Sequence, residues 1–298
     1  GDDMEFELWW LLAFQLFFAL GWMAARIDIK QLLTESRALP LSYFKGLNFL
    51  LNEQPDKAIE AFIEVVKVDP QTVELHFALG SLFRRRGEVE RAIRMHQNLL
   101  ERADLVPEQR ENALFELAQD YLKAGLLDRA EELFLRLKGT RHEQAGLKFM
   151  LEIYEQEKDW LKAIEISRRM DSITGQSSAK DIAHFYCELG AGEMLHSRPD
   201  QARRYLEEAL SVNRKCTRAN VLLGDLEAGP KRYEEAIKAW KRIESQNPAY
   251  LSLVAEKLLE AYKAIDKLDQ GLHLLKGYLS SYPSLDLLNV VFRAILEK

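Results

Sequence analysis

The sequence predicts an all-α protein: a solenoid of about seven helix-turn-helix repeats with a terminal helix, preceded by one transmembrane helix. Three observations predict this fold. Small residues recur at a nearly constant step, turn-forming residues are scarce, and one long apolar run lies near the N-terminus. With 15 Gly and 8 Pro in 298 residues, the chain falls below the roughly 12% that these two residues average in globular proteins. A turn-rich all-β fold is therefore disfavoured.

The apolar run comes first in the chain. From Leu8 to Ala25 no residue is charged, and a helix of that length spans about 27 Å, close to the thickness of a bilayer's hydrocarbon core. Acidic residues precede the run and no small-residue cleavage site follows it, so we expect an uncleaved transmembrane anchor over residues 4–26. Arg26, Lys30 and Arg37 follow the run, which by the positive-inside rule places the remainder of the chain in the cytoplasm. The alternative is a buried helix of a soluble domain, although such helices usually carry a polar stripe.

The flanking segments complete the predicted domain organisation. Residues 1–3, before Met4, are interpreted as an expression scar, and residues 27–40 as a juxtamembrane linker. The solenoid is expected over residues 41–298.

A small residue marks the same place in the second helix of each repeat. Successive markers are 33 to 39 residues apart, and a period near 34 is that of the tetratricopeptide repeat (TPR). Twelve residues before each marker stands a small or apolar residue, often Gly, where the two helices of one repeat approach closely. The markers are Ala58, Ala92, Ala130, Ala163, Ala202, Ala236 and Gly271, and the residues twelve before them are Gly46, Gly80, Ala118, Leu151, Gly190, Gly224 and Leu259.

The longest steps and the C-terminus add detail to the repeat pattern. The steps of 38 and 39 residues predict loop insertions around residues 103–107 and 174–179. The segment from Leu285 to Lys298 is predicted to be a single helix, which either caps the solenoid or begins an eighth repeat.

Charge and motifs disfavour two classes of function. The 47 acidic and 41 basic residues give a net charge of -6, the wrong sign for binding a nucleic-acid backbone nonspecifically. The phosphate-loop, dinucleotide-binding, nucleophile-elbow and zinc-protease motifs are all missing from the sequence. We therefore expect no enzyme, no nucleic-acid partner, no catalytic residues and no cofactor in this chain.

The two cysteines are candidates both for metal ligation and for a disulfide. His184 and Cys187 are three residues apart on one predicted helix, but zinc needs three or four ligands. Packing or surface contact is favoured over a metal site. Cys187 and Cys216 are too few for a disulfide scaffold, which favours a reducing compartment.

TPR geometry places certain first-helix positions on an inner groove. In the first three repeats aromatic and basic side chains alternate there, which suits an extended or helical peptide with apolar anchors and acidic neighbours. Two alternatives stay open: Arg84, Arg85 and Arg86 also fit a solvated helix C-terminus, and the two phenylalanines also fit packing between repeats. The predicted partner-binding residues are Tyr43, Leu47, Glu74, Phe77, Arg84, Arg85, Phe115, Gln119 and Lys123.

Segments outside the markers resemble the lipopolysaccharide assembly protein B family, membrane-anchored TPR proteins of Gram-negative bacteria. Generic TPR sequences share only the marker positions, so similarity elsewhere is informative. The resemblance extends from Met4 to the C-terminus. It is carried by residues 46–51 and 56–58, residues 79–97, residues 120–130 and residues 183–189.

The resemblance implies an adaptor on the cytoplasmic face of the bacterial inner membrane that limits lipopolysaccharide synthesis. Members of the family bring the deacetylase of the first committed lipid A step to the membrane-bound AAA+ protease FtsH, and an inner-membrane lipopolysaccharide sensor restrains them. The alternative is a scaffold that gathers lipopolysaccharide synthesis or export enzymes without directing proteolysis. A homodimer is also considered.

One feature of the family has no counterpart in this sequence. The family ends in a rubredoxin-like metal module with two C-x-x-C pairs, whereas this chain ends at Lys298 without them. Either the chain is truncated, which we favour, or this member lacks the module.

Overall fold

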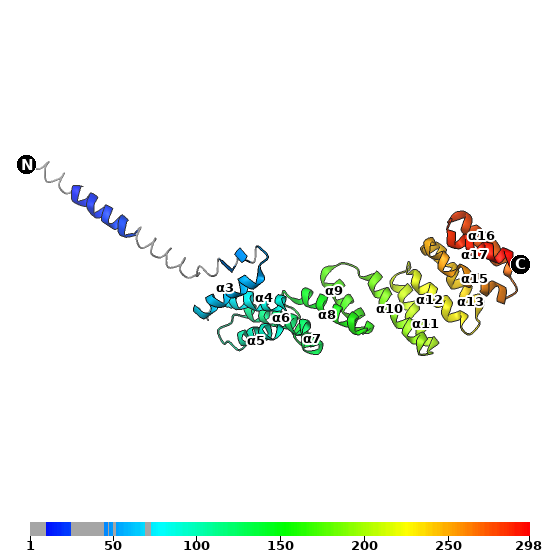
Figure 1. Ribbon diagram of the computed structural model, residues 1–298, viewed down its shortest axis with the longest axis horizontal. Coiled ribbons are helices and arrows are strands. Elements are labelled where there is room, and N and C mark those ends of the chain that lie inside the picture. Colours follow the sequence, from blue (N-terminus) through cyan, green and yellow to red (C-terminus); the bar gives the residue numbers. More distant parts are fainter. Residues whose placement is uncertain (1–9, 25–44, 47, 50–51, 69–72) are drawn as a thin grey trace, which may run out of the picture. The chain divides into compact units, whose positions relative to one another are not determined.

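The computed structural model describes residues 10–24, 45–46, 48–49, 52–68 and 73–298, and every regular element in these residues is helical (Figure 1). The predicted all-α class is confirmed. The chain divides into two compact units, residues 1–143 and residues 144–298.

The first unit consists of helices that pack on their neighbours along the chain. In addition, α4 packs on α6, so the first helices of these two repeats form one layer, which we call the inner layer, and the second helices α5 and α7 pack against it as the outer layer. The helices are α3 (Pro55–Val68), α4 (Val73–Arg86), α5 (Val89–Leu100), α6 (Pro107–Lys123) and α7 (Leu127–Leu135).

The second unit repeats this arrangement. Here α10 packs on α12, and α15 packs on α17. The helices are α8 (Glu143–Glu157), α9 (Trp160–Thr174), α10 (Ala179–Leu195), α11 (Pro199–Val212), α12 (Thr217–Ala228), α13 (Tyr233–Lys241), α14 (Ile243–Gln246), a 3₁₀ turn (Pro248–Tyr250), α15 (Leu251–Ala264), α16 (Leu268–Ser281) and α17 (Leu285–Leu296).

Glycines allow the two helices of a repeat to approach closely, as the marker pattern predicts. A Cβ added to Gly190 of α10 would lie 2.7 Å from Cδ2 of Leu206 in α11, and Leu206 is completely buried. In two other repeats the glycine likewise faces the side chain sixteen residues further along the chain: Gly80 faces the ring of His96, and Gly224 faces the indole of Trp240. In these repeats a side chain in place of the glycine would force the two helices apart.

The turn between the two helices of each repeat ends in a left-handed residue. After that residue, a backbone N–H bonds back to the carbonyl five residues earlier, as in Leu126 to Tyr121 (2.9 Å) and Asp159 to Tyr154 (2.9 Å). This pattern is a Schellman motif, which satisfies carbonyls left free at a helix C-terminus. Among the described residues, the left-handed residues of these turns are Glu53, Gly87, Gly125, Lys158, Ser197, Lys231 and Asp266, and only two of these seven are glycine.

Both predicted insertions and the terminal helix are present. Irregular segments join α5 to α6 and α9 to α10 at the places where the marker step lengthens. The terminal helix is α17, which buries Leu287 and Val291 and exposes Leu285 and Phe292.

The N-terminal apolar segment is described only in part. Residues 10–24 are helical and expose large apolar side chains, among them Trp10, Phe14 and Phe17. Within the described ranges, no helix combines the length and the apolar character needed to cross a membrane. The predicted expression scar and linker lie outside the described residues.

Candidate partner-binding surfaces

The predicted groove residues fall on the inner layer of the first unit. Those on α4 are Glu74, Phe77, Arg84 and Arg85, and those on α6, which packs beside α4, are Phe115, Gln119 and Lys123. Tyr43 and Leu47 lie outside the described residues.

Arg84 ties the two inner helices of this unit together. Its Nη1 lies 2.8 Å from Oε2 of Glu116 and 2.8 Å from Oδ1 of Asp120, and only 15% of its side chain is exposed. Burial opposes the charge of Arg84, but the hydrogen bonds and charges of the two carboxylates outweigh burial and raise the pKa of the guanidinium. The guanidinium therefore already binds two anions within the protein.

His96 extends this cluster to the outer layer. Nδ1 of its imidazole contacts Oδ2 of Asp120, and both side chains are completely buried. Residues of α4, α5 and α6 thus share one buried carboxylate. The sequence contains a sign of this buried carboxylate, because Asp120 occupies a repeat position that elsewhere holds apolar core residues such as Leu82, Ile153 and Leu226.

The two predicted phenylalanines pack within the first unit and remain partly exposed. The Phe77 ring lies 6.2 Å from that of His96 and contacts the cluster of Leu99 and Leu105. Phe115 stacks on His142 at 4.5 Å between ring centroids. Burial, followed by the charge of Arg141, lowers the pKa of His142, so its imidazole is neutral near pH 7. Part of each phenylalanine ring is therefore engaged in packing within the first unit.

Two cations of the predicted groove remain available on its surface. Arg85 and Lys123 are exposed at the C-terminal ends of α4 and α6, and no ion pair engages either of them among the described residues. By contrast, Nε of Arg86 lies 3.0 Å from Oε1 of Glu88. The partly exposed phenylalanines together with Arg85 and Lys123 form what we term the N-terminal partner surface.

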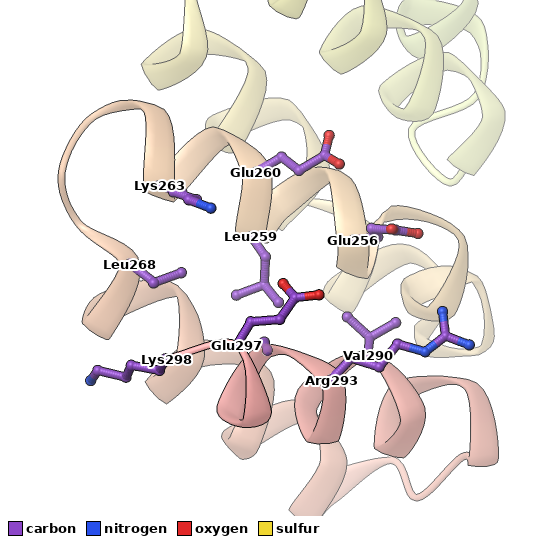
Figure 2. Close-up of a pocket in the computed structure, with 10 residues that line it drawn as sticks. Glu256, Leu259, Glu260, Lys263, Leu268, Val290, Arg293, Glu297 and Lys298 are labelled. Atoms are coloured by element: carbon purple, nitrogen blue, oxygen red, sulfur yellow. The ribbon is translucent and has the colours of Figure 1, made fainter.

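A second candidate surface lies in the last repeat. A cavity of about 300 Å³ opens between α15 and α17, with Leu268 of α16 at one end (Figure 2). Its apolar residues are Leu259, Leu268, Val290 and Ala294, and its charged residues are Glu256, Glu260, Lys263, Arg293, Glu297 and Lys298.

The prediction from the first three repeats misses this cavity. The pattern that identifies it was nevertheless present in the sequence, because the same offsets from the marker Gly271 fall on Glu256, Glu260 and Lys263. Figure 2 shows Glu260 on α15 and Glu297 at the C-terminal end of α17. We refer to this lining as the C-terminal pocket.

His184 and Cys187, the residues considered as metal ligands, contact different partners. His184 is exposed, and its Nδ1 lies 3.2 Å from Nη1 of Arg218. Cys187 is buried, and its Sγ lies 3.6 Å from Sγ of Cys216. Across the part of the chain that the structure describes, no group of three or more His, Cys, Asp or Glu side chains is placed to hold a metal ion.

Sequence comparisons identify the repeats and two relatives. The tetratricopeptide repeat family matches residues 45–107 and 194–250. Lipopolysaccharide assembly protein B of Escherichia coli (strain K12) is 37% identical over 251 residues, which are 84% of this chain and 64% of that protein. The protein of the same name from Haemophilus influenzae is 34% identical over 265 residues, 84% of this chain and 66% of that protein. The chain thus spans slightly less than two thirds of the length of these relatives.

Among solved structures, a tetratricopeptide repeat protein from Parabacteroides merdae aligns over 85% of this chain and 97% of that chain, at 15% identity and a TM-score of 0.42. The C-terminal part of a TPR repeat-containing protein from Cytophaga hutchinsonii aligns over 83% and 98%, at 11% identity and a TM-score of 0.44.

Proposed function

The chain is a tetratricopeptide-repeat homologue of the proteins named lipopolysaccharide assembly protein B, and on that premise we propose that it is a non-enzymatic, membrane-anchored adaptor. In this role it binds the deacetylase of the lipid A pathway and delivers it to the protease FtsH, under the control of an inner-membrane lipopolysaccharide sensor. The observation that carries the proposal is the identity of 34 to 37% over 84% of the chain.

The exposed apolar helix supports the anchor in this proposal. Most side chains of residues 10–24 are exposed: Trp10 is 64% exposed and Phe14 is 74% exposed. Contact with lipid would remove this apolar surface from water. The uncharged run of residues 8–25 and the basic residues Arg26, Lys30 and Arg37 that follow it support a single-pass location in the inner membrane with the repeats in the cytoplasm. Holding the repeats at the membrane would raise their effective concentration near a membrane protease.

The N-terminal partner surface supports the adaptor's binding role. Phe77 and Phe115 offer partly exposed rings, and Arg85 and Lys123, about two turns further along the same helices, offer cations that no ion pair engages among the described residues. A segment with apolar anchors flanked by acidic residues would bury the rings and pair with the cations.

A matched pair of variants tests the adaptor. Cells depleted of the protein should accumulate the deacetylase, and the wild-type chain should restore its short half-life in a pulse-chase measurement. Arg85→Glu/Lys123→Glu should restore it poorly, because two attractive charges become repulsive. The control Arg94→Glu/Arg136→Glu makes the same charge change at exposed positions of α5 and after α7, and should restore turnover fully. An unchanged deacetylase half-life on depletion would rule out the adaptor.

The presence of two candidate surfaces favours a second function, a scaffold that gathers lipopolysaccharide synthesis or export enzymes. The N-terminal partner surface and the C-terminal pocket belong to different compact units, so each can be altered without the other. The scaffold predicts that such enzymes co-purify with the chain from membranes while the deacetylase half-life stays normal. It also predicts that Glu256→Lys/Glu260→Lys loses a subset of these partners.

A further inference from the structure

The two cysteines of the chain lie next to each other in the second unit. Cys187 is in the middle of α10, and Cys216 directly precedes α12, so the pair joins the first helices of two successive repeats. Their sulfur atoms are 3.6 Å apart. A disulfide bond is about 2.04 Å long, so the sulfurs need to approach by only about 1.6 Å.

The two thiols differ in exposure. Cys187 is buried with no exposed surface, whereas Cys216 is only partly buried. Small solutes therefore reach Cys216 first. Such an asymmetric arrangement, with one accessible thiol and a second thiol behind it, is found where an oxidised cysteine is resolved by a neighbour.

The surroundings also distinguish the two sulfurs chemically. Cys216 is the N-cap of α12, where free N–H groups and the helix dipole favour an anion. The neighbouring thiol of Cys187 is the largest cause that lowers the pKa of Cys216; burial opposes it, while the backbone of Ala219 and the charge of Arg218 support it. The same contact, followed by burial, raises the pKa of Cys187. The other charged groups that act on the pair are Arg218 and Glu188, and Arg218 in turn contacts both Glu188 and His184.

We propose that Cys216 and Cys187 form a reversible redox-modification site, in which Cys216 reacts with a hydroperoxide and Cys187 resolves the product to an intramolecular disulfide. The function proposed above is not needed for this site.

The chemistry balances in two steps. The Cys216 thiolate attacks one peroxide oxygen, so that an S–O bond forms, the O–O bond breaks and the second oxygen leaves as an alcohol or water after taking up a proton. Cys216 is thereby oxidised to a sulfenic acid and the peroxide is reduced. The Cys187 thiol then loses its proton and attacks the Cys216 sulfur, forming the S–S bond and releasing water. A dithiol reductant reverses the bond by thiol–disulfide exchange.

The disulfide would cross-link α10 to the start of α12. These helices pack against each other in the inner layer of the second unit. A covalent link between them limits any change in the spacing of the two repeats, and it also restricts the unfolded chain between the two cysteines.

The test uses the full chain purified under reducing conditions and then treated with hydrogen peroxide. Since the chain has no other cysteine, loss of both thiols with a mass lower by two hydrogen atoms, and a cross-linked peptide containing both residues, is the expected result. Reduction should restore both thiols, and the melting temperature of the second unit should be higher in the oxidised protein. Thiols that persist under peroxide, or disulfide-linked dimers in place of the internal bond, would overturn the proposal.

Single variants establish the order of the two steps. Cys187→Ser should stop at a sulfenic acid on Cys216 that a dimedone probe captures, whereas Cys216→Ser should leave Cys187 unreacted. Equal reactivity of the two variants would contradict the assigned roles. In the wild-type chain, alkylation of Cys216 should show a midpoint below the pH of about 8.5 expected for a free thiol. Arg218→Gln should slow oxidation by peroxide. Titration of the unfolded variant should still detect two thiols, so that slower oxidation is distinguished from loss of a cysteine.

Discussion

The carboxylate of Asp120 in α6 contacts the imidazole of His96 in α5, with both side chains fully buried. Its second oxygen binds Arg84 of α4 at 2.8 Å. Three helices of the first unit therefore converge on a single anion. Breaking a buried pair leaves an uncompensated charge, which is far more costly than losing an exposed pair.

The first prediction concerns this anion. Asp120→Ala should lower the stability of the first unit by about 3–5 kcal/mol, because Arg84 loses a buried partner and His96 loses its hydrogen bond. Hydrogen–deuterium exchange should show faster exchange throughout α4, α5 and α6. Glu132→Ala, at an exposed position of α7, is the control and should change exchange only locally. Equal protection in both variants would mean that the buried cluster contributes nothing to stability.

The second prediction separates two neighbouring arginines. Arg84→Glu should destabilise the first unit, because it places a third carboxylate beside Glu116 and Asp120. Arg85→Glu should leave stability within about 0.5 kcal/mol of the wild type, as expected for an exposed side chain that no ion pair engages in the described part of the chain. Thermal unfolding and amide exchange measure the difference. Since Arg84→Glu alters folding, partner binding is better examined with Arg85 and Lys123.

The third prediction uses two glycines of one helix. Gly190→Ala should cost about 1–3 kcal/mol, because its Cβ would meet the buried side chain of Leu206. Gly192→Ala has no atom within 4 Å of the added Cβ and should stabilise α10 by up to about 1 kcal/mol. Urea unfolding of the second unit gives both values. Similar effects of the two substitutions would show that helix propensity, rather than close approach, determines the result.

The fourth prediction concerns the turns within repeats. Lys158 and Asp266 have φ angles of 57° and 59°, a left-handed conformation that costs an ordinary residue about 1–2 kcal/mol. Lys158→Gly and Asp266→Gly should therefore stabilise the second unit by up to about 1 kcal/mol each. The control Glu165→Gly, in the interior of α9, should destabilise it by about 1 kcal/mol. Thermal unfolding distinguishes the two signs, and destabilisation by the turn variants would contradict the argument.

Much of the fold is predictable because each repeat is a local structure. The marker residues specify which two helices pair, and the glycine twelve residues earlier specifies how closely they approach, as Gly190 and Leu206 illustrate. The longer steps specify where loops are inserted. These features depend on residues within about 34 positions of one another, so one sequence suffices to recognise them.

The candidate sites are less predictable because they depend on contacts between repeats. The sequence placed Arg84 on the inner surface, but its binding to Glu116 and Asp120 depends on how α4 and α6 stack. The C-terminal pocket likewise requires α17 to pack on α15. A charge pattern cannot tell which cations are already neutralised by the next repeat.

Residue spacing and residue type alone predict the helical class, the repeat period, the helix pairs, the insertions and the resemblance to lipopolysaccharide assembly protein B. Three features emerge only from how the helices pack: Asp120 is the shared buried anion, Arg84 rather than Arg85 is ion-paired among the described residues, and Cys187 contacts Cys216. The physical reason is that these contacts join residues 24 to 36 positions apart in adjacent repeats, and their distances are fixed by side-chain packing between stacked helices rather than by the period that produces the helices.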